Sequence, residues 1–194
     1  MLKPIIWICL FFSVFLYAHP HIFANVFVSI EFEPSGEIII KNRWVFDELY
    51  SAAKLDVVDL NEDGKLSAEE WYEIERSVVQ SAQRFNYYNY LLVGPKFIAS
   101  DGYKNFEIKK EGALLVIYFD LNFNLKAQKE YTILTFALKD LSNYIQFDLD
   151  MKKVKVQAPS NIEVEYFVDV LEGLTLFKAF PPSTEALYLR FRGK

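Results

Sequence analysis

The sequence predicts a fold of the α+β class that is mainly β: a β-sandwich-like domain with a helix-loop-helix inserted after its first hairpin. Short segments rich in Val, Ile, Tyr and Phe recur about every 8–12 residues, which is typical of sandwiches and open barrels. Helical spacing of apolar residues is confined to one stretch, about residues 47–85. Because no internal repeat or low-complexity linker divides the chain, we expect one domain.

The first 18 residues have the pattern of a cleavable signal peptide. Lys3 gives a positive start, residues 5–16 are an unbroken apolar run, and Ala18 ends that run at a small residue. These are the three regions of a secretory signal. A membrane-spanning helix needs about 20 apolar residues, and this run is shorter. We therefore expect cleavage after Ala18 and a periplasmic or secreted protein made of residues 19–194.

Composition argues against several classes of function. Cys9, the one cysteine of the chain, lies in the predicted signal, so the mature chain has neither disulfides nor Cys-based metal sites. With 26 acidic and 21 basic residues and no basic cluster, nothing indicates nucleic acid as a partner. The mature chain also lacks a cysteine nucleophile, a Gly-x-Ser-x-Gly elbow and a phosphate loop, so we do not expect an enzyme.

Strands are expected to begin directly after the signal. Ile22–Glu33 and Glu37–Phe46 are extended runs that flank the turn residues Pro34, Ser35 and Gly36, a pattern that predicts a β-hairpin. We expect the strands to form a monomeric domain. Further strands are predicted at residues 106–109, 113–123, 131–138, 144–149, 154–156, 162–170 and 187–191.

Two helices are expected between the hairpin and the later strands, over residues 47–58 and 67–85. Each has apolar residues at helical spacing, which predicts one buried side. In the first helix this side is predicted to comprise Leu49, Ala52, Ala53, Leu55 and Val58. In the second helix it is predicted to comprise Trp71, Ile74, Val78, Ala82 and Phe85.

The segment between these helices, Asp59–Glu70, fits the twelve-residue calcium loop of an EF-hand. Calcium is a hard cation that takes six to eight oxygen ligands. Gly64 stands where the loop turns sharply, and Leu66 is expected to pin the loop to the protein. The predicted ligands are Asp59, Asn61, Asp63, Lys65 through its backbone carbonyl, Ser67 directly or through a water, and Glu70 through both carboxylate oxygens.

A plain polar turn is the alternative interpretation, since Ser67 and Glu70 also form a capping-box pattern. A capping box leaves the alternating acidic residues of the loop unexplained, so we favour the calcium site. A second hand is not expected: the segment that starts at Asp120 has Leu125 in place of Gly and Tyr131 in place of the closing Glu. A solitary hand predicts a structural or affinity-tuning ion rather than a sensor.

A second candidate metal site is formed by His19 and His21, the only histidines of the chain, which flank Pro20. Cleavage after Ala18 would give His19 a free α-amine beside its imidazole, a chelate suited to copper, nickel, cobalt or zinc. Pro20 has no amide hydrogen, so the square-planar mode that uses that amide is excluded. The alternative is that both histidines simply begin a surface strand.

The chain resembles the domain of unknown function 1007 family in three segments: His-Pro-His-Ile-Phe at 19–23, Trp-Val-Phe-Asp-Glu at 44–48 followed by Tyr50 and Ser51, and the loop 59–70. The resemblance is clear over about the first 70 residues. It implies an exported protein of the kind described as a periplasmic component of ABC-type transport systems, often encoded beside nickel/cobalt permeases. It also implies that the histidine pair and the segment Trp44–Ser51 form a shared surface.

Residues and resemblance together predict an exported calcium-binding protein that acts as a periplasmic accessory or binding component of a divalent transition-metal transport system. An inner-membrane metal permease is the expected partner. The alternative is a calcium-stabilised β domain that binds carbohydrate or peptide and has no transition-metal role, with Tyr87 and Tyr88 in an aromatic run as a stacking platform. Aromatic residues that leave a helix are more often core, which argues against this platform.

Overall fold

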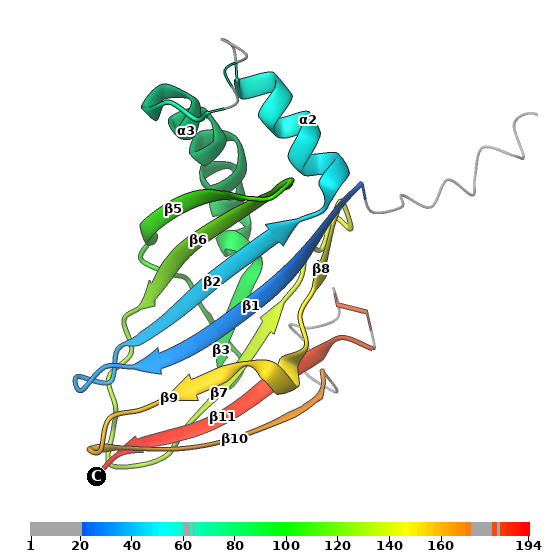
Figure 1. The fold of residues 1–194 in the computed structure, drawn as a ribbon. Helices are drawn as coiled ribbons and strands as arrows, with labels where there is room; N and C mark the ends of the chain where they lie inside the picture. The colour runs from blue at the N-terminus through cyan, green and yellow to red at the C-terminus, as the bar shows by residue number, and fades with distance from the viewer. Residues whose placement is uncertain (1–20, 60–62, 64, 172–179, 182) are drawn as a thin grey trace, which may run out of the picture.

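Two β-sheets share one hydrophobic core in the computed structural model, which describes residues 21–59, 63, 65–171, 180, 181 and 183–194. This confirms the predicted α+β, mainly β, sandwich-like architecture (Figure 1). The predicted signal peptide lies outside these residues. No helix within them is long and apolar enough to cross a membrane.

The first sheet follows the order β5-β6-β2-β1-β8, and β9 also pairs with β1. The second sheet follows the order β10-β11-β7-β3-β4. The strands of the first sheet are β1 (Ile22–Phe32), β2 (Ile38–Phe46), β5 (Tyr103–Glu111), β6 (Leu114–Phe123), β8 (Ile145–Asp148) and β9 (Lys155–Gln157). Those of the second are β3 (Asn89–Val93), β4 (Lys96–Ile98), β7 (Thr132–Leu138), β10 (Ile162–Val170) and β11 (Glu185–Gly193).

The predicted hairpin is confirmed as β1 and β2, which pair antiparallel from Ala24 opposite Phe46 to Phe32 opposite Ile38. Side chains of β1 alternate between the core and the surface, as expected of a strand with one buried face. The turn depends on Gly36, whose φ is 89°. A Cβ there would also come within 2.1 Å of the Ala127 nitrogen, so this position needs glycine on two grounds.

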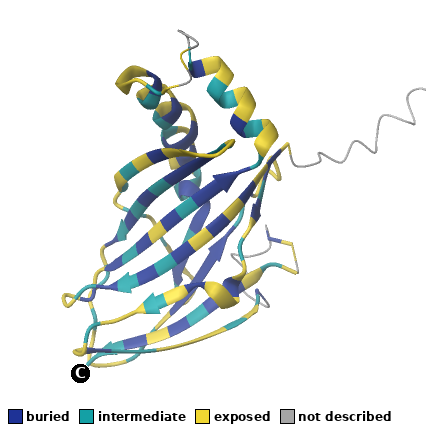
Figure 2. Ribbon diagram, viewed as in Figure 1, coloured by how far each residue is buried: buried dark blue, intermediate teal, exposed yellow. Residues whose placement is uncertain are grey.

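Buried and exposed residues alternate along the strands of the first sheet (Figure 2). Trp44 of β2 is a fully buried member of the core. Its ring contacts Phe119 edge-on at 4.8 Å between centroids and Phe147 at 5.0 Å. Tyr88, from the other side of the core, lies 6.2 Å from it. Aromatic contacts of this kind add to the burial of apolar area. The cluster packs β2, β6 and β8 of the first sheet against Tyr88, the residue that directly precedes β3 of the second.

Two helices, α2 (Glu48–Val58) and α3 (Ala68–Glu75), follow the hairpin as predicted. α3 continues into a π turn, η2 (Arg76–Gln80), and a 3₁₀ segment, η3 (Gln83–Tyr88). The predicted buried side of the second helix is confirmed, because its five residues are all buried or half-buried. They are Trp71, Ile74, Val78, Ala82 and Phe85.

The predicted buried side of α2 is wrong in part. Leu49 is 80% exposed, whereas Ser51 is fully buried. The Ser51 hydroxyl donates to the Phe46 carbonyl at 3.3 Å and accepts the Leu115 N–H at 2.9 Å. These bonds to β2 and β6 rotate the helix so that Ser51, Leu55 and Val58 face inward. Ala52 and Ala53 consequently lie on the exposed side with Leu49.

Strands β3 and β4 were not predicted. The aromatic run before β3 follows the predicted second helix directly, and the turn within it was not recognised. Asn86, Tyr87 and Tyr88 have φ values of 51°, 55° and 58°, in the left-handed region that non-glycine residues rarely occupy. The Asn86 side chain holds this turn: its Oδ1 accepts the Ser100 N–H at 2.9 Å, and its Nδ2 donates to the Asn89 carbonyl at 2.5 Å. The turn redirects the chain from the helices into β3.

Replacing Ser51 by alanine is expected to lower the free energy of unfolding by about 1–3 kcal/mol, because the buried Leu115 N–H loses its acceptor. Ser81→Ala is the matched control, since Ser81 is exposed and its hydroxyl donates only to carbonyls of its own helical segment. Urea unfolding followed by circular dichroism measures both variants. Equal stability of the two would show that this hydroxyl does not fasten α2 to the sheet.

Candidate functional site

The predicted calcium loop lies between the two helices in the order that an EF-hand requires. α2 ends at Val58, and the N–H of the capping residue Asp59 donates to the Leu55 carbonyl at 2.9 Å. α3 begins at Ala68 with Ser67 as its N-cap. The first and ninth loop residues therefore coincide with a helix end and a helix start. Asn61 and Gly64 lie outside the residues that the structure describes.

Two side chain–backbone hydrogen bonds shape the first half of the loop. Asp59 Oδ1 accepts the Asp63 N–H at 3.1 Å, and Asp63 Oδ1 accepts the Lys65 N–H at 2.8 Å. Both carboxylates therefore have backbone N–H partners among the described residues of the loop.

Glu70, the closing residue of the loop, is only 6% exposed. Its Oε2 accepts the Ser67 N–H at 2.7 Å, while Ser67 Oγ accepts the Glu70 N–H at 3.4 Å. This is a complete capping box. The capping-box pattern and the calcium pattern therefore use the same Glu70 carboxylate. If both of its oxygens bound calcium, Oε2 would either share its hydrogen bond from the Ser67 N–H with the ion or lose it.

The loop is attached to the core by apolar side chains. Leu66, as predicted, is half-buried and packs with Leu55 and Trp71 against the core. The donors that the described loop residues offer are all oxygens, which fits a hard cation such as calcium. Over the described part of the chain, no three His, Cys, Asp or Glu side chains are grouped so that they could hold a metal ion together.

The predicted histidine site lies near the N-terminal end of α2, opposite the loop; we call the segment around His21 the histidine end. His19 is outside the described residues, and His21 is exposed at the start of β1. The His21 N–H donates to the Tyr144 carbonyl at 2.9 Å, and the two rings lie 5.2 Å apart. His21 thus has a fixed backbone position beside the loop that precedes β8.

Asp47 joins this end to the helices. Its Oδ2 accepts the Phe23 N–H and its Oδ1 accepts the Tyr50 N–H, both at 2.9 Å. Its own N–H donates to the Phe23 carbonyl at 2.9 Å. The sequence predicted Asp47 only as the first residue of a helix and as part of the segment Trp44–Ser51, although an Asp directly before a helical run is a recognisable N-cap signal.

The start of β1 lies beside the segment Trp44–Ser51. Four of the eight residues of this segment, Val45 among them, are buried, so the expected shared surface is wrong for half of it. Trp44, Phe46 and Ser51 are buried and belong to the core. Glu48 and Leu49 are the exposed residues of this segment. The shared feature of the two segments is therefore mainly structural, since they pair as neighbouring strand ends.

Tyr87 and Tyr88, considered as a stacking platform, are 2% and 8% exposed. Tyr87 packs edge-on against Tyr103 at 5.7 Å, and Tyr88 packs against Phe147 at 5.1 Å. Their rings form part of the core, so these two residues offer no flat surface to a sugar or peptide.

Burial raises the pKa of three tyrosines of the domain. It raises the pKa of Tyr50 to about 12, with smaller contributions from neighbouring acidic groups that include Asp47. It raises the pKa of Tyr88 to about 12 as well. The pKa of Tyr103 is about 12 through burial and through its 2.6 Å hydrogen bond to Glu75 at the end of α3.

A family model described as "Protein of unknown function (DUF1007)" matches residues 5–171, a span that includes both candidate sites and the strands from β1 to β10. No curated protein matches the chain.

The raised tyrosine pKa values predict a loss of stability between about pH 10 and pH 12. An unfolded tyrosine ionises near its ordinary pKa of about 10, whereas these folded tyrosines hold their protons to about 12. Stability is therefore intact below pH 10 and falls as the pH rises toward 12. Urea titrations at pH 9 and pH 11 measure the fall. Tyr50→Phe should reduce it, while Tyr72→Phe removes a hydroxyl that is exposed on α3 and should not.

Proposed function

Because this chain belongs to the DUF1007 family of proteins of unknown function, its role has to be argued from its own residues; we propose that it is an exported calcium-binding protein that serves as a periplasmic accessory or binding component of a divalent transition-metal transport system. The main support is the segment 59–70, in which oxygen donors at EF-hand spacing lie between two helices. Export is proposed from the signal pattern of residues 1–18.

Calcium would act on the fold through Glu70. This residue stands in the first turn of α3, close to the core residue Ile74 one turn later. An ion bound by Asp59, Asp63 and Glu70 would neutralise three carboxylates and tie the end of α2 to the start of α3. The proposed role of calcium is accordingly to stabilise the helix pair and not to open it, since Leu55, Leu66 and Trp71 already pack on the core.

The transition-metal part of the proposal depends on the mature N-terminus. Cleavage after Ala18 would place a free amine and two imidazoles within three residues, a nitrogen-rich set suited to a late first-row divalent metal. His21 supports this role by its exposure and its fixed backbone. The nearby carboxylate of Asp47 already accepts two N–H groups, so its main task is to hold this end in place.

One helix relates the two candidate sites. α2 begins at the residue after Asp47 and ends at the residue before Asp59. Its 11 residues span about 16 Å. A calcium ion that fixes the far end of α2 would therefore also steady the histidine end. An inner-membrane permease for nickel or cobalt is the proposed recipient of the metal, a role that rests on the family resemblance.

Calcium is expected to raise the melting temperature. At a calcium concentration of about 100 times the Kd, binding to the folded form adds about 2.7 kcal/mol, which corresponds to about 5–10 °C for a chain of this size. A solitary hand should have a Kd of about 10⁻⁵ to 10⁻³ M. Thermal melts with calcium and with a chelator measure the shift.

The decisive variant is Glu70→Gln, because glutamine can keep the capping box but cannot give calcium a bidentate carboxylate. It should melt like the parent protein in chelator and gain little from calcium. Glu69→Gln is the matched control, since Glu69 is the adjacent exposed acid in the same helical turn. Identical melting curves of the parent protein with and without calcium would rule out the site.

The mature chain is expected to bind copper or nickel through its N-terminus, most tightly as copper. The amine and imidazoles coordinate only when deprotonated, so affinity should rise from about pH 5 to about pH 8. Calorimetric titration should compare the chain that begins at His19, the same chain with one added residue before His19, and His21→Ala. Equal binding by all three at pH 7.5 would show that no terminal site exists and would leave the calcium site unaffected.

A further inference from the structure

The edges of the two sheets differ in how far they are protected from pairing with other chains. β4 has three residues, and β8 and β9 have four and three. β5 is longer, but its register shifts between Lys104 and Glu107, and it contains the further lysines Lys109 and Lys110. Short strands, bulges and lysines are the usual means of blocking a sheet edge. These edges are therefore blocked.

β10 has none of these protections. Its nine residues contain no lysine and no proline, and they pair with β11 without a register shift from Ile162 opposite Gly193 to Val170 opposite Glu185. Within the described part of the chain, no strand pairs with its other side. A long regular edge with free N–H and C=O groups is a template for another strand.

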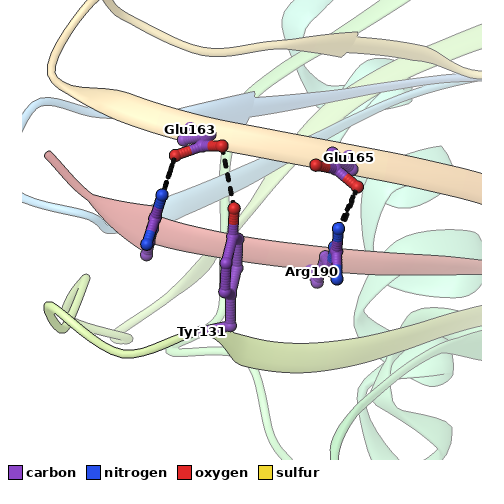
Figure 3. Close-up of polar contacts among 5 residues, drawn as sticks. Tyr131, Glu163, Glu165 and Arg190 are labelled. Atoms are coloured by element: carbon purple, nitrogen blue, oxygen red, sulfur yellow. Dashed lines mark hydrogen bonds and ion pairs between the residues drawn. The ribbon is translucent and has the colours of Figure 1, made fainter.

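Side chains on the outer face hold β10 in place (Figure 3). Arg192 and Arg190 of β11 form ion pairs with Glu163 and Glu165 at 2.8 and 2.6 Å. The Tyr131 hydroxyl donates to Glu163 at 2.8 Å, and both guanidinium groups lie over the Tyr131 ring, at 4.4 and 4.8 Å from its centroid. These contacts fix the strand from the side of β11.

At the two ends of the outer edge of β10, the Ile162 N–H donates to the Pro159 carbonyl, and the Val170 carbonyl accepts the Tyr188 hydroxyl. The uncovered stretch of the edge is therefore residues 164–168.

The inner face of β10 fixes it as well. Ile162 is buried in the core, and Val164 and Val168 pack against that core. At the middle of the strand, however, Tyr166 is 51% and Phe167 is 60% exposed. Phe167 stacks on Tyr188 of β11 at 5.3 Å with nearly parallel rings. The edge is thus rigid, and it presents one aromatic side chain on each face beside the open backbone.

We propose that the open edge of β10 binds an extended segment of another protein, added to the sheet as a further antiparallel strand with basic residues at alternate positions. Backbone hydrogen bonds would supply affinity and the alternating side chains would supply selectivity. The charge of the strand supports this choice: β10 contains no basic residue, and Asp169 shares its outer face with Glu163 and Glu165. Arg192 and Arg190 of β11 pair with the two glutamates but not with Asp169.

A second copy of the chain fits this edge poorly. If two β10 strands paired antiparallel, their outer faces would align, and the twofold axis could pass through residue 165, 166 or 167. An axis at residue 165 sets Glu165 opposite its own copy. An axis at 166 sets Glu163 opposite Asp169, and an axis at 167 sets Glu165 opposite Asp169. Like charges directly opposite one another destabilise a strand pair. A basic alternating strand would instead place a cation near Asp169, the acid of this face that neither arginine of β11 pairs with.

The test uses purified protein and a fluorescein-labelled nine-residue peptide that alternates lysine and valine, with a glutamate–valine peptide as the control probe. Fluorescence anisotropy is expected to show binding of the lysine peptide only. Phe167→Lys, at the edge, should weaken binding about tenfold or more, because it adds a like charge beside the added strand. Ile133→Lys is the matched control: Ile133 lies on the same outer face with 61% exposure, but on an inner strand.

Binding that is lost in Phe167→Lys and kept in Ile133→Lys supports the proposal, provided that circular dichroism shows both variants folded. Absence of lysine-peptide binding, or equal binding by both variants, overturns it. A concentration-dependent dimer in sedimentation that Phe167→Lys abolishes would overturn it in favour of pairing between two copies of the chain.

Discussion

The carboxylate of Asp47 joins the start of β1, the end of β2 and the first turn of α2. One of its oxygens accepts the Phe23 N–H and the other accepts the Tyr50 N–H. Charge-assisted bonds of this kind are stronger than neutral ones, and the helix N-terminus also favours a negative charge. Both candidate metal sites depend on this junction, since the histidine end begins next to it and the calcium loop follows at the far end of α2.

The proposed calcium loop contains one side chain, Glu70, that would serve two purposes. Glu70 caps α3 by accepting the Ser67 N–H, so the exit helix is formed even without an ion. The same carboxylate would close a calcium site. In the described residues, however, Asp59, Asp63 and Glu70 are not gathered into a group that could hold an ion. Binding would therefore require these carboxylates to move together, and the cost of that ordering favours a modest affinity.

Local patterns were sufficient for the features that depend on neighbouring residues. The β1–β2 hairpin, the buried side of α3 and the helices on either side of the loop all follow from periodicity and turn residues. The orientation of α2 could not be predicted from local patterns, because it depends on the hydrogen bond from the Leu115 N–H, on the distant strand β6, to the Ser51 hydroxyl. β3 was hidden for a similar reason: the left-handed turn at Asn86 is held by Ser100. The ion pairs between Arg190 and Glu165 and between Arg192 and Glu163 could not be predicted either, because they depend on the pairing of β10 with β11.

The position of β1 constrains the order in which the chain can fold. β1 comes first in the sequence of strands but lies inside the first sheet, where it pairs with β2 on one side and in parallel with β8 and β9 on the other. Residues 145–157 must therefore be present before that sheet is complete. Such long-range parallel pairing is slow, because loop closure precedes the contacts that reward it. If the chain is exported before it folds, this slow completion of the first sheet would keep the polypeptide unfolded, and able to pass through a translocation channel, until most of it has crossed the membrane.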